Sequence, residues 1–162
     1  MKIERDFVYD PSLVLYLPFR ELDGGSFRSR DAYGHLCTNN GAVWNFNGLV
    51  FDGVDDYVRL PLTNTLDFTS QSFSLIVWIK LTGGDATKTI YNRGTYQVAG
   101  YRWTISSTNR VTIATYQNLT DQNSNSVPIT TNVWTHVAVV RSNASCRCYT
   151  DGRDSTETVG TH

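Results

Sequence analysis

The chain has 162 residues, a formal net charge of -1 and 18% charged residues. Its length suits one domain with a single core, and its 40% hydrophobic content is typical of folded chains. No long run of one charge sign occurs, which excludes the basic stripe of a typical nucleic-acid binder. No apolar stretch approaches the roughly 20 residues of a membrane span. We therefore predict a folded domain with no nucleic-acid partner and no membrane insertion.

The aromatic residues, nine Tyr, seven Phe and four Trp, favour pleated strands. Residues 1–11 read as an N-terminal arm that ends at Pro11. This arm lacks the apolar region of about 7–15 residues that marks a secretory signal. We predict a second part, residues 12–162, that forms one β-sandwich domain.

The first half of the chain alternates short apolar runs with turn residues. Residues 13–17 predict a strand closed by Pro18, and residues 20–33 predict a loop rich in Gly and Ser. Short strands are expected at residues 41–44, 48–51 and 57–60, with Asp52-Gly53 as a strong turn signal between the last two.

Residues 73–81 show the clearest alternation, with apolar side chains on both faces. This pattern predicts a central strand that is covered on both sides. A further strand is expected at residues 89–91. Residues 101–105 and 111–116 then predict a hairpin around a Ser-Thr-Asn turn.

Residues 117–126 are polar and are expected to be flexible. Strands follow at residues 134–140 and 146–150, before an Asp151-Gly152 turn. Many short strands with frequent turn signals indicate an all-β antiparallel sandwich or barrel.

Five motifs, in order, resemble hallmarks of the laminin G-like domains of the concanavalin A-like lectin/glucanase superfamily. They are Leu13-Val14-Leu15-Tyr16-Leu17-Pro18-Phe19, Phe51-Asp52-Gly53-Val54-Asp55-Asp56-Tyr57-Val58, Phe73-Ser74-Leu75-Ile76-Val77-Trp78-Ile79-Lys80, Asn132-Val133-Trp134-Thr135-His136-Val137-Ala138-Val139-Val140-Arg141 and Tyr149-Thr150-Asp151-Gly152. The resemblance implies a jelly-roll sandwich of two curved antiparallel sheets. Function follows less directly, because it depends on the site and not the fold.

The resemblance departs from the family after the Asp-Gly turn, where residues 154–162 can supply one short strand. The strand expected at 13–17 would then have an unpaired edge that invites pairing with another chain. Two interpretations stay open: the chain is a fragment, or it completes its sandwich within a homo-oligomer or a larger assembly.

Enzymatic chemistry is not expected. Glycoside hydrolysis needs two carboxyl groups about 5–9.5 Å apart, and none of Glu4, Glu21 and Glu157 lies in such an array. His136 has no visible triad partners, so we interpret it as a packing residue on its strand.

Calcium is the metal that the sequence favours, because it takes oxygen ligands from carboxylates and loop carbonyls. Asp52, Asp55 and Asp56 lie on one tight turn and are the candidate ligands. The alternative is that Asp52 and Gly53 set the turn and that Asp55 and Asp56 begin the next strand.

Sugar binding needs aromatic rings flanked by polar groups. The candidate ligand-binding residues are Tyr91, Tyr96, Arg102, Trp103 and Tyr116. An alternative interpretation places the rings of Tyr101 and Trp103 in the core. Trp44, Trp78 and Trp134 are expected to pack.

The three cysteines, Cys37, Cys146 and Cys148, are an odd number and do not form a disulfide framework. We interpret them as small core side chains. One bridge from Cys37 to either of the others stays open for an extracellular protein. The sequons at Asn118 and Asn143 matter only on a eukaryotic secretory route.

These observations favour a non-catalytic carbohydrate-binding or adhesion module, whose partner is a glycan or surface glycoconjugate. The alternative is a structural or decoration protein of a virus or phage particle, or of another surface assembly. It would self-associate through residues 1–11 and an open sheet edge. Either interpretation places the protein outside the cell or on a particle surface, the virion included.

Overall fold

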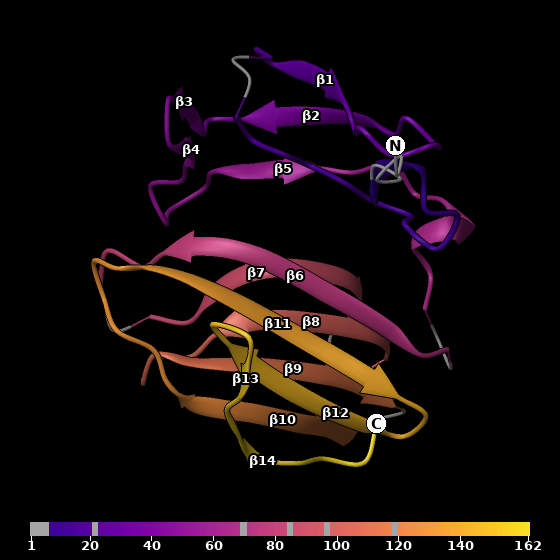
Figure 1. The fold of residues 1–162 in the computed structure, drawn as a ribbon, viewed down its shortest axis with the longest axis vertical. Coiled ribbons are helices and arrows are strands. Elements are labelled where there is room, and N and C mark those ends of the chain that lie inside the picture. The colour runs from indigo at the N-terminus through magenta and orange to yellow at the C-terminus, as the bar shows by residue number, and fades with distance from the viewer. Residues whose placement is uncertain (1–6, 21–22, 69–70, 84–85, 96–97, 118–119) are drawn as a thin grey trace, which may run out of the picture. The chain divides into compact units, whose positions relative to one another are not determined.

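The computed structural model describes residues 7–20, 23–68, 71–83, 86–95, 98–117 and 120–162, and the side chains of 117–123 are not described (Figure 1). The chain forms two compact units, Met1–Leu66 (unit 1) and Asp67–His162 (unit 2). No helix in the described ranges is long and apolar enough to cross a membrane.

Unit 1 contains two small antiparallel sheets. The three-stranded sheet has the order β1-β2-β5, and the other is a hairpin of β3 and β4. The strands are β1 (Ser26–Arg28), β2 (Leu36–Asn40), β3 (Val43–Asn45), β4 (Gly48–Val50) and β5 (Tyr57–Arg59), with 3-10 turns η1 (Phe7–Tyr9) and η2 (Asn64–Leu66). The strand β1 falls inside the loop predicted at residues 20–33, so that prediction was wrong at its centre.

Residues 13–17 do not form the predicted strand. The amide of Tyr16 donates to Asp31 Oδ2 at 2.9 Å, and the amide of Arg30 donates to Tyr16 O at 2.9 Å. Both main-chain groups of Tyr16 are therefore hydrogen-bonded to the turn at residues 30–31 and are not available to pair with a neighbouring strand.

An aromatic cluster organises the core of unit 1. The rings of Phe27 and Trp44 meet edge to face at 5.4 Å, and Phe19 contacts both. The Trp44 indole donates to Gly24 O at 2.9 Å, which satisfies its polar edge. The predicted packing role of Trp44 is thus confirmed.

Unit 2 contains a five-stranded sheet of order β14-β10-β9-β8-β7 and a four-stranded sheet of order β13-β12-β11-β6. All pairings in both sheets are antiparallel. The bounds are β6 (Phe73–Lys80), β7 (Lys88–Thr95), β8 (Ala99–Ile105), β9 (Arg110–Gln117), β10 (Thr120–Pro128), β11 (Trp134–Ser142), β12 (Ser145–Thr150), β13 (Arg153–Asp154) and β14 (Thr156–Thr158). The predicted all-β antiparallel architecture is confirmed, as is the hairpin of β8 and β9.

The core of unit 2 lies between the inward faces of its two sheets. Ile105 and Ile113 from the five-stranded sheet join Val137, Val139 and Cys148 from the four-stranded sheet. Alternate residues of each strand supply this layer, as the period of two requires. All three cysteines of the chain are buried free thiols, as predicted.

The strand β10 occupies residues that the sequence predicted to be flexible. Its residues Ser124 and Ser126 are fully buried. The Ser126 hydroxyl accepts the Val111 amide at 3.0 Å and donates to Val127 O at 2.6 Å. Buried hydroxyls that are satisfied by hydrogen bonds can stand where apolar side chains would otherwise face the core. The sequence of β10 therefore shows no alternation of apolar and polar residues.

The strand β6 is the last strand of its sheet within unit 2, and one of its faces is open. Ile76 is 64% exposed and Trp78 is 59% exposed. The prediction of a central strand covered on both faces was therefore wrong: β11 pairs with one edge of β6, and only the face carrying Phe73 and Val77 packs on the core.

Candidate functional site

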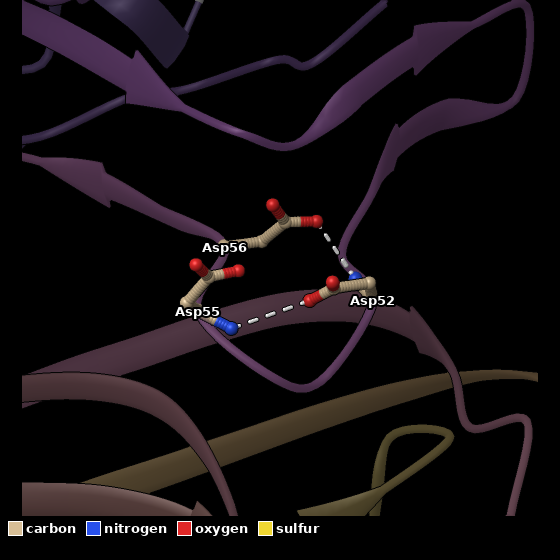
Figure 2. A group of neighbouring side chains, drawn as sticks. All are labelled: Asp52, Asp55 and Asp56. Carbon is tan, nitrogen blue, oxygen red and sulfur yellow. Dashed lines mark hydrogen bonds between the residues drawn. The ribbon is translucent and has the colours of Figure 1, made fainter.

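Three carboxylates gather on the turn between β4 and β5 (Figure 2). One carboxylate oxygen each from Asp52, Asp55 and Asp56 lies within 4.8 Å of the others. The amide of Asp52 donates to Asp56 Oδ2 at 2.8 Å, and the amide of Val54 donates to Asp52 Oδ1 at 2.8 Å. Main-chain amides of the turn thus hold the carboxylates of Asp52 and Asp56 in place, and the Asp55 carboxylate lies beside them.

Hydrogen bonding favours the ionised form of one carboxylate of this acidic turn, that of Asp52. The hydrogen bond from the Val54 amide lowers the pKa of Asp52 below its ordinary value. Asp52 and Asp55 are exposed, and Asp56 is half-buried. A hard cation such as calcium fits this donor set, with water completing its shell of oxygens.

Two of the predicted sugar-binding residues face the core. Trp103 is 2% exposed and lies in the core cluster. Tyr91 stacks on the buried ring of Tyr101, with centroids 5.6 Å apart. The Trp103 ring therefore offers no face to a ligand in solvent, and the half-buried Tyr91 ring has one face covered by Tyr101.

Arg102 and Tyr116 share the opposite face of the five-stranded sheet. Arg102 pairs with Ala114 and Tyr116 pairs with Gly100, so the two side chains are diagonal neighbours on adjacent strands. Tyr116 is buried and Arg102 is half-buried. The last predicted residue, Tyr96, lies outside the described residues.

A further group of polar and aromatic side chains lies on the outer face of the four-stranded sheet, and sequence analysis did not identify it. We call Trp78, Lys80, Trp134, His136 and Asp151 the Trp78 platform. Trp78 pairs with His136, and Lys80 pairs with Trp134, across β6 and β11. Trp134 is 45% exposed, and Lys80 and Asp151 are also exposed.

The platform forms a row across β6, β11 and the turn between β12 and β13. The rings of Trp78 and His136 meet edge to face with centroids 5.3 Å apart. The His136 amide donates to Asp151 Oδ1 at 3.0 Å, and the Asp151 amide donates to His136 O at 2.8 Å. Solvent-facing indoles are thereby held beside an imidazole, an ammonium and a carboxylate.

The predicted packing roles of Trp78 and Trp134 were therefore wrong, whereas His136 is half-buried as expected. One signal could have identified Trp78. Its face of β6 begins with Ser74 and ends with Lys80, and both are exposed. Polar residues at both ends of an alternating face indicate contact with water.

A comparison with models of known protein families identifies the superfamily of this chain. A family model of the concanavalin A-like lectin/glucanase superfamily, of the laminin G type, matches residues 52–162. The match includes the acidic turn and all of unit 2. The chain belongs to this superfamily, and membership indicates a module of the carbohydrate-binding or adhesion type. No curated protein matches the sequence.

Proposed function

We propose that the protein is a non-catalytic carbohydrate-binding module that attaches to glycans or surface glycoconjugates outside the cell or on a particle surface. The observation that carries this proposal is the Trp78 platform. Large exposed aromatic side chains on a sheet face are uncommon, and a contiguous group of them marks an interaction site. Membership of a lectin-containing superfamily supports the same conclusion.

The platform supplies the chemistry that a sugar ring needs. The C–H face of a pyranose stacks on the indole of Trp78 or Trp134. Lys80 donates hydrogen bonds to hydroxyl groups, Asp151 accepts them, and the half-buried ring of His136 supports the Trp78 indole from the side. An open surface of this kind binds single sugars weakly, so strong attachment would come from several modules acting together.

Calcium is part of this proposal as a ligand of the acidic turn. Asp52, Asp55 and Asp56 would supply carboxylate oxygens, and the ion would stiffen the turn between β4 and β5. Calcium would then act on the stability of unit 1, while the Trp78 platform in unit 2 would bind sugar.

A glycan array on the purified chain tests the proposal, run once with calcium and once with a chelator. We expect binding to a defined class of sugars that Trp78→Ala abolishes and Tyr9→Ala preserves. Tyr9 is the matched control, because it is an exposed aromatic residue of unit 1. Binding that survives both Trp78→Ala and Trp134→Ala would exclude the platform as the sugar site.

The non-catalytic part of the proposal has its own test. Hydrolysis needs two carboxyl groups that flank the scissile bond, and the platform includes a single one, that of Asp151. Incubation of the protein with the glycan that it binds should release no reducing sugar. Release that Asp151→Asn removes would identify an enzyme instead.

A second candidate function, a structural or decoration protein of a virus, phage or other surface assembly, is favoured by the hairpin of β3 and β4. Phe46 at its tip is 95% exposed, and Val43 and Val50 are also exposed. Self-association would bury these side chains. Light scattering after size exclusion should then show oligomers that Phe46→Ser or deletion of residues 1–11 converts to monomers. A monomer in the unaltered chain would exclude this function.

A further inference from the structure

Residues 155–162 cross from one sheet of unit 2 to the other, and we call this segment the latch. Its first residue, Ser155, donates its amide to Cys148 O of β12 at 3.0 Å. The strand β14 then pairs with β10 at the edge of the five-stranded sheet (Figure 1). The segment finally returns to the turn between β11 and β12, where the His162 amide donates to Ala144 O at 2.7 Å.

The side chain of His162 anchors the end of the latch in the protein interior. His162 is 5% exposed. Its Nδ1 lies 3.1 Å from the Thr115 hydroxyl of β9, and its Nε2 lies 2.7 Å from the Ser124 hydroxyl of β10. Both ring nitrogens therefore have partners that are uncharged.

These partners suit a neutral imidazole, which offers one donor and one acceptor. The Ser124 hydroxyl oxygen already accepts the Gly160 amide at 2.8 Å, so its hydrogen is free to donate to Nε2 of His162. The Thr115 hydroxyl then accepts from Nδ1–H. A protonated ring would carry two donors, and Ser124 would have to accept a second hydrogen and turn its own away.

The charges around the ring also oppose a second proton. Arg141 of β11 is buried and donates from Nη2 to His162 O at 3.2 Å. Burial, and then the charge of Arg141, lower the pKa of His162 to about 4. Burial raises the pKa of the nearby Cys146 thiol of β12 to about 11, so that thiol is neutral. Among the described side chains, β14 offers the single carboxylate of Glu157, which pairs with Arg110.

We propose that the latch is released by acid: protonation of His162 frees residues 155–162 while the rest of the two sheets stays folded. Release uncovers the edge of β10 at its pairing with β14. The hydrogen-bonding groups of this edge could then pair with a strand from another chain.

The difference in the pKa of His162 between the released and the latched state determines how strongly pH changes the closing equilibrium of the latch. A released histidine titrates near its ordinary value of 6.5, and the latched one near 4. The equilibrium constant for closing the latch should therefore fall about 30-fold between pH 7.5 and pH 5, and about 100-fold by pH 4. Above pH 7 the latch should not respond to pH.

Hydrogen exchange by NMR on the full chain tests this proposal. Protection factors are measured at pH 7.5 and pH 5 for the amides of Gly160 and His162. Amides in the middle of β9 and β11 serve as the internal reference. We expect the latch amides to lose protection about 30-fold while the reference amides keep theirs. An equal loss in both sets would show unfolding of the whole unit and overturn the proposal.

Two variants separate His162 from other acid-sensitive groups. His162→Gln keeps a hydrogen-bonding side chain that cannot be protonated, so its latch protection should not change between the two pH values. Glu157→Gln removes the other ionisable side chain of the latch and should keep the response of the unaltered protein. A response that persists in His162→Gln would overturn the proposal.

If His162→Gln leaves the latch open at both pH values, a titration of the unaltered protein still tests the proposal. The ring nitrogens of His162 are followed by their chemical shifts through the same titration. We expect a midpoint well below 6.5, with latch protection already falling as the pH drops from 6.5 toward that midpoint. A midpoint near 6.5 with protection retained would overturn the proposal.

Discussion

Gly41 lies directly against the carboxylate of Asp56, so closely that a Cβ atom on Gly41 would overlap Asp56 Oδ1. Gly41 also has a φ of +85°, which side chains other than glycine rarely adopt. We expect Gly41→Ala to displace Asp56 and to destabilise unit 1 by about 1–3 kcal/mol. Urea unfolding, followed by a probe in unit 1, measures this change.

Gly53 provides the matched control for that substitution. It lies in the acidic turn with a φ of +78°, but a Cβ there would meet no atom within 4 Å. Gly53→Ala should therefore show the cost of backbone strain alone, about 1 kcal/mol. Equal effects at the two glycines would show that the contact with Asp56 has no energetic weight.

Asp31 should stabilise the non-strand conformation of residues 13–17, because its carboxylate accepts the Tyr16 amide. Burial raises the pKa of Asp31, but hydrogen bonds from Ser29 and from the amides of Tyr16 and Tyr33 outweigh it and hold the pKa below 3.8. Asp31→Asn leaves one oxygen where two now accept, so we expect a loss of about 1–3 kcal/mol. Thermal unfolding at pH 7 measures this loss.

The same carboxylate predicts a pH dependence with a definite sign. Because the pKa of Asp31 is lower in the folded state, its contribution is complete above about pH 4 and is lost as the pH falls through the folded pKa. Asp31→Asn should remove that part of the acid sensitivity. Asp23→Asn, which breaks an ion pair with the partly exposed Arg30, should change stability by less than about 1 kcal/mol. A larger effect at Asp23 than at Asp31 would contradict this assignment.

Trp103 and Trp78 should respond in opposite ways to truncation. Trp103→Ala removes a core ring and should cost about 3–5 kcal/mol in the free energy of unfolding of unit 2. Trp78→Ala removes an exposed ring and should cost less than about 1 kcal/mol while abolishing sugar binding. Chemical denaturation of both variants provides the comparison, and similar costs would mean that the Trp78 face is covered in solution.

The three thiols should resist alkylation in the native protein. Burial raises the pKa of Cys37 to about 11 and that of Cys148 to about 12, so few reactive thiolates form at pH 8. Cys37 reports on unit 1, whereas Cys146 and Cys148 report on unit 2. Mass spectrometry after pulses of iodoacetamide in increasing urea should follow the opening of each unit. Rapid labelling without urea would disprove the burial of these thiols.

Local signals in the sequence were sufficient for the turns and for most strands. The Asp-Gly signal at residues 52–53 identified the acidic turn, and alternation identified β6, β8 and β9. The strand β10 was missed because Ser124 and Ser126 face inward with satisfied hydroxyls, which gives a polar sequence to a buried strand.

The binding face was harder to predict, because exposure depends on which strands pair. An indole is equally apolar in a core and on a surface, so the Trp78 side chain itself does not reveal its environment, and the local signal is limited to Ser74 and Lys80 at the two ends of its face. Its exposure follows from the pairing of β6 with β11, which lies far away in the sequence. The opposite orientations of Arg102 and Trp103 are a simpler case, since neighbours on one strand always face apart.

The pairing of β6 with β11 also sets the order in which unit 2 can fold. The strands β7 to β10 lie between the two in sequence, and each of these strands pairs with the next through a local hairpin. Local contacts form faster than distant ones. During synthesis β6 emerges first and must wait, with the edge that later pairs with β11 still open, until β11 leaves the ribosome. The nascent chain is therefore most prone to aggregation in that interval, and chaperones would have their clearest target at residues 73–80.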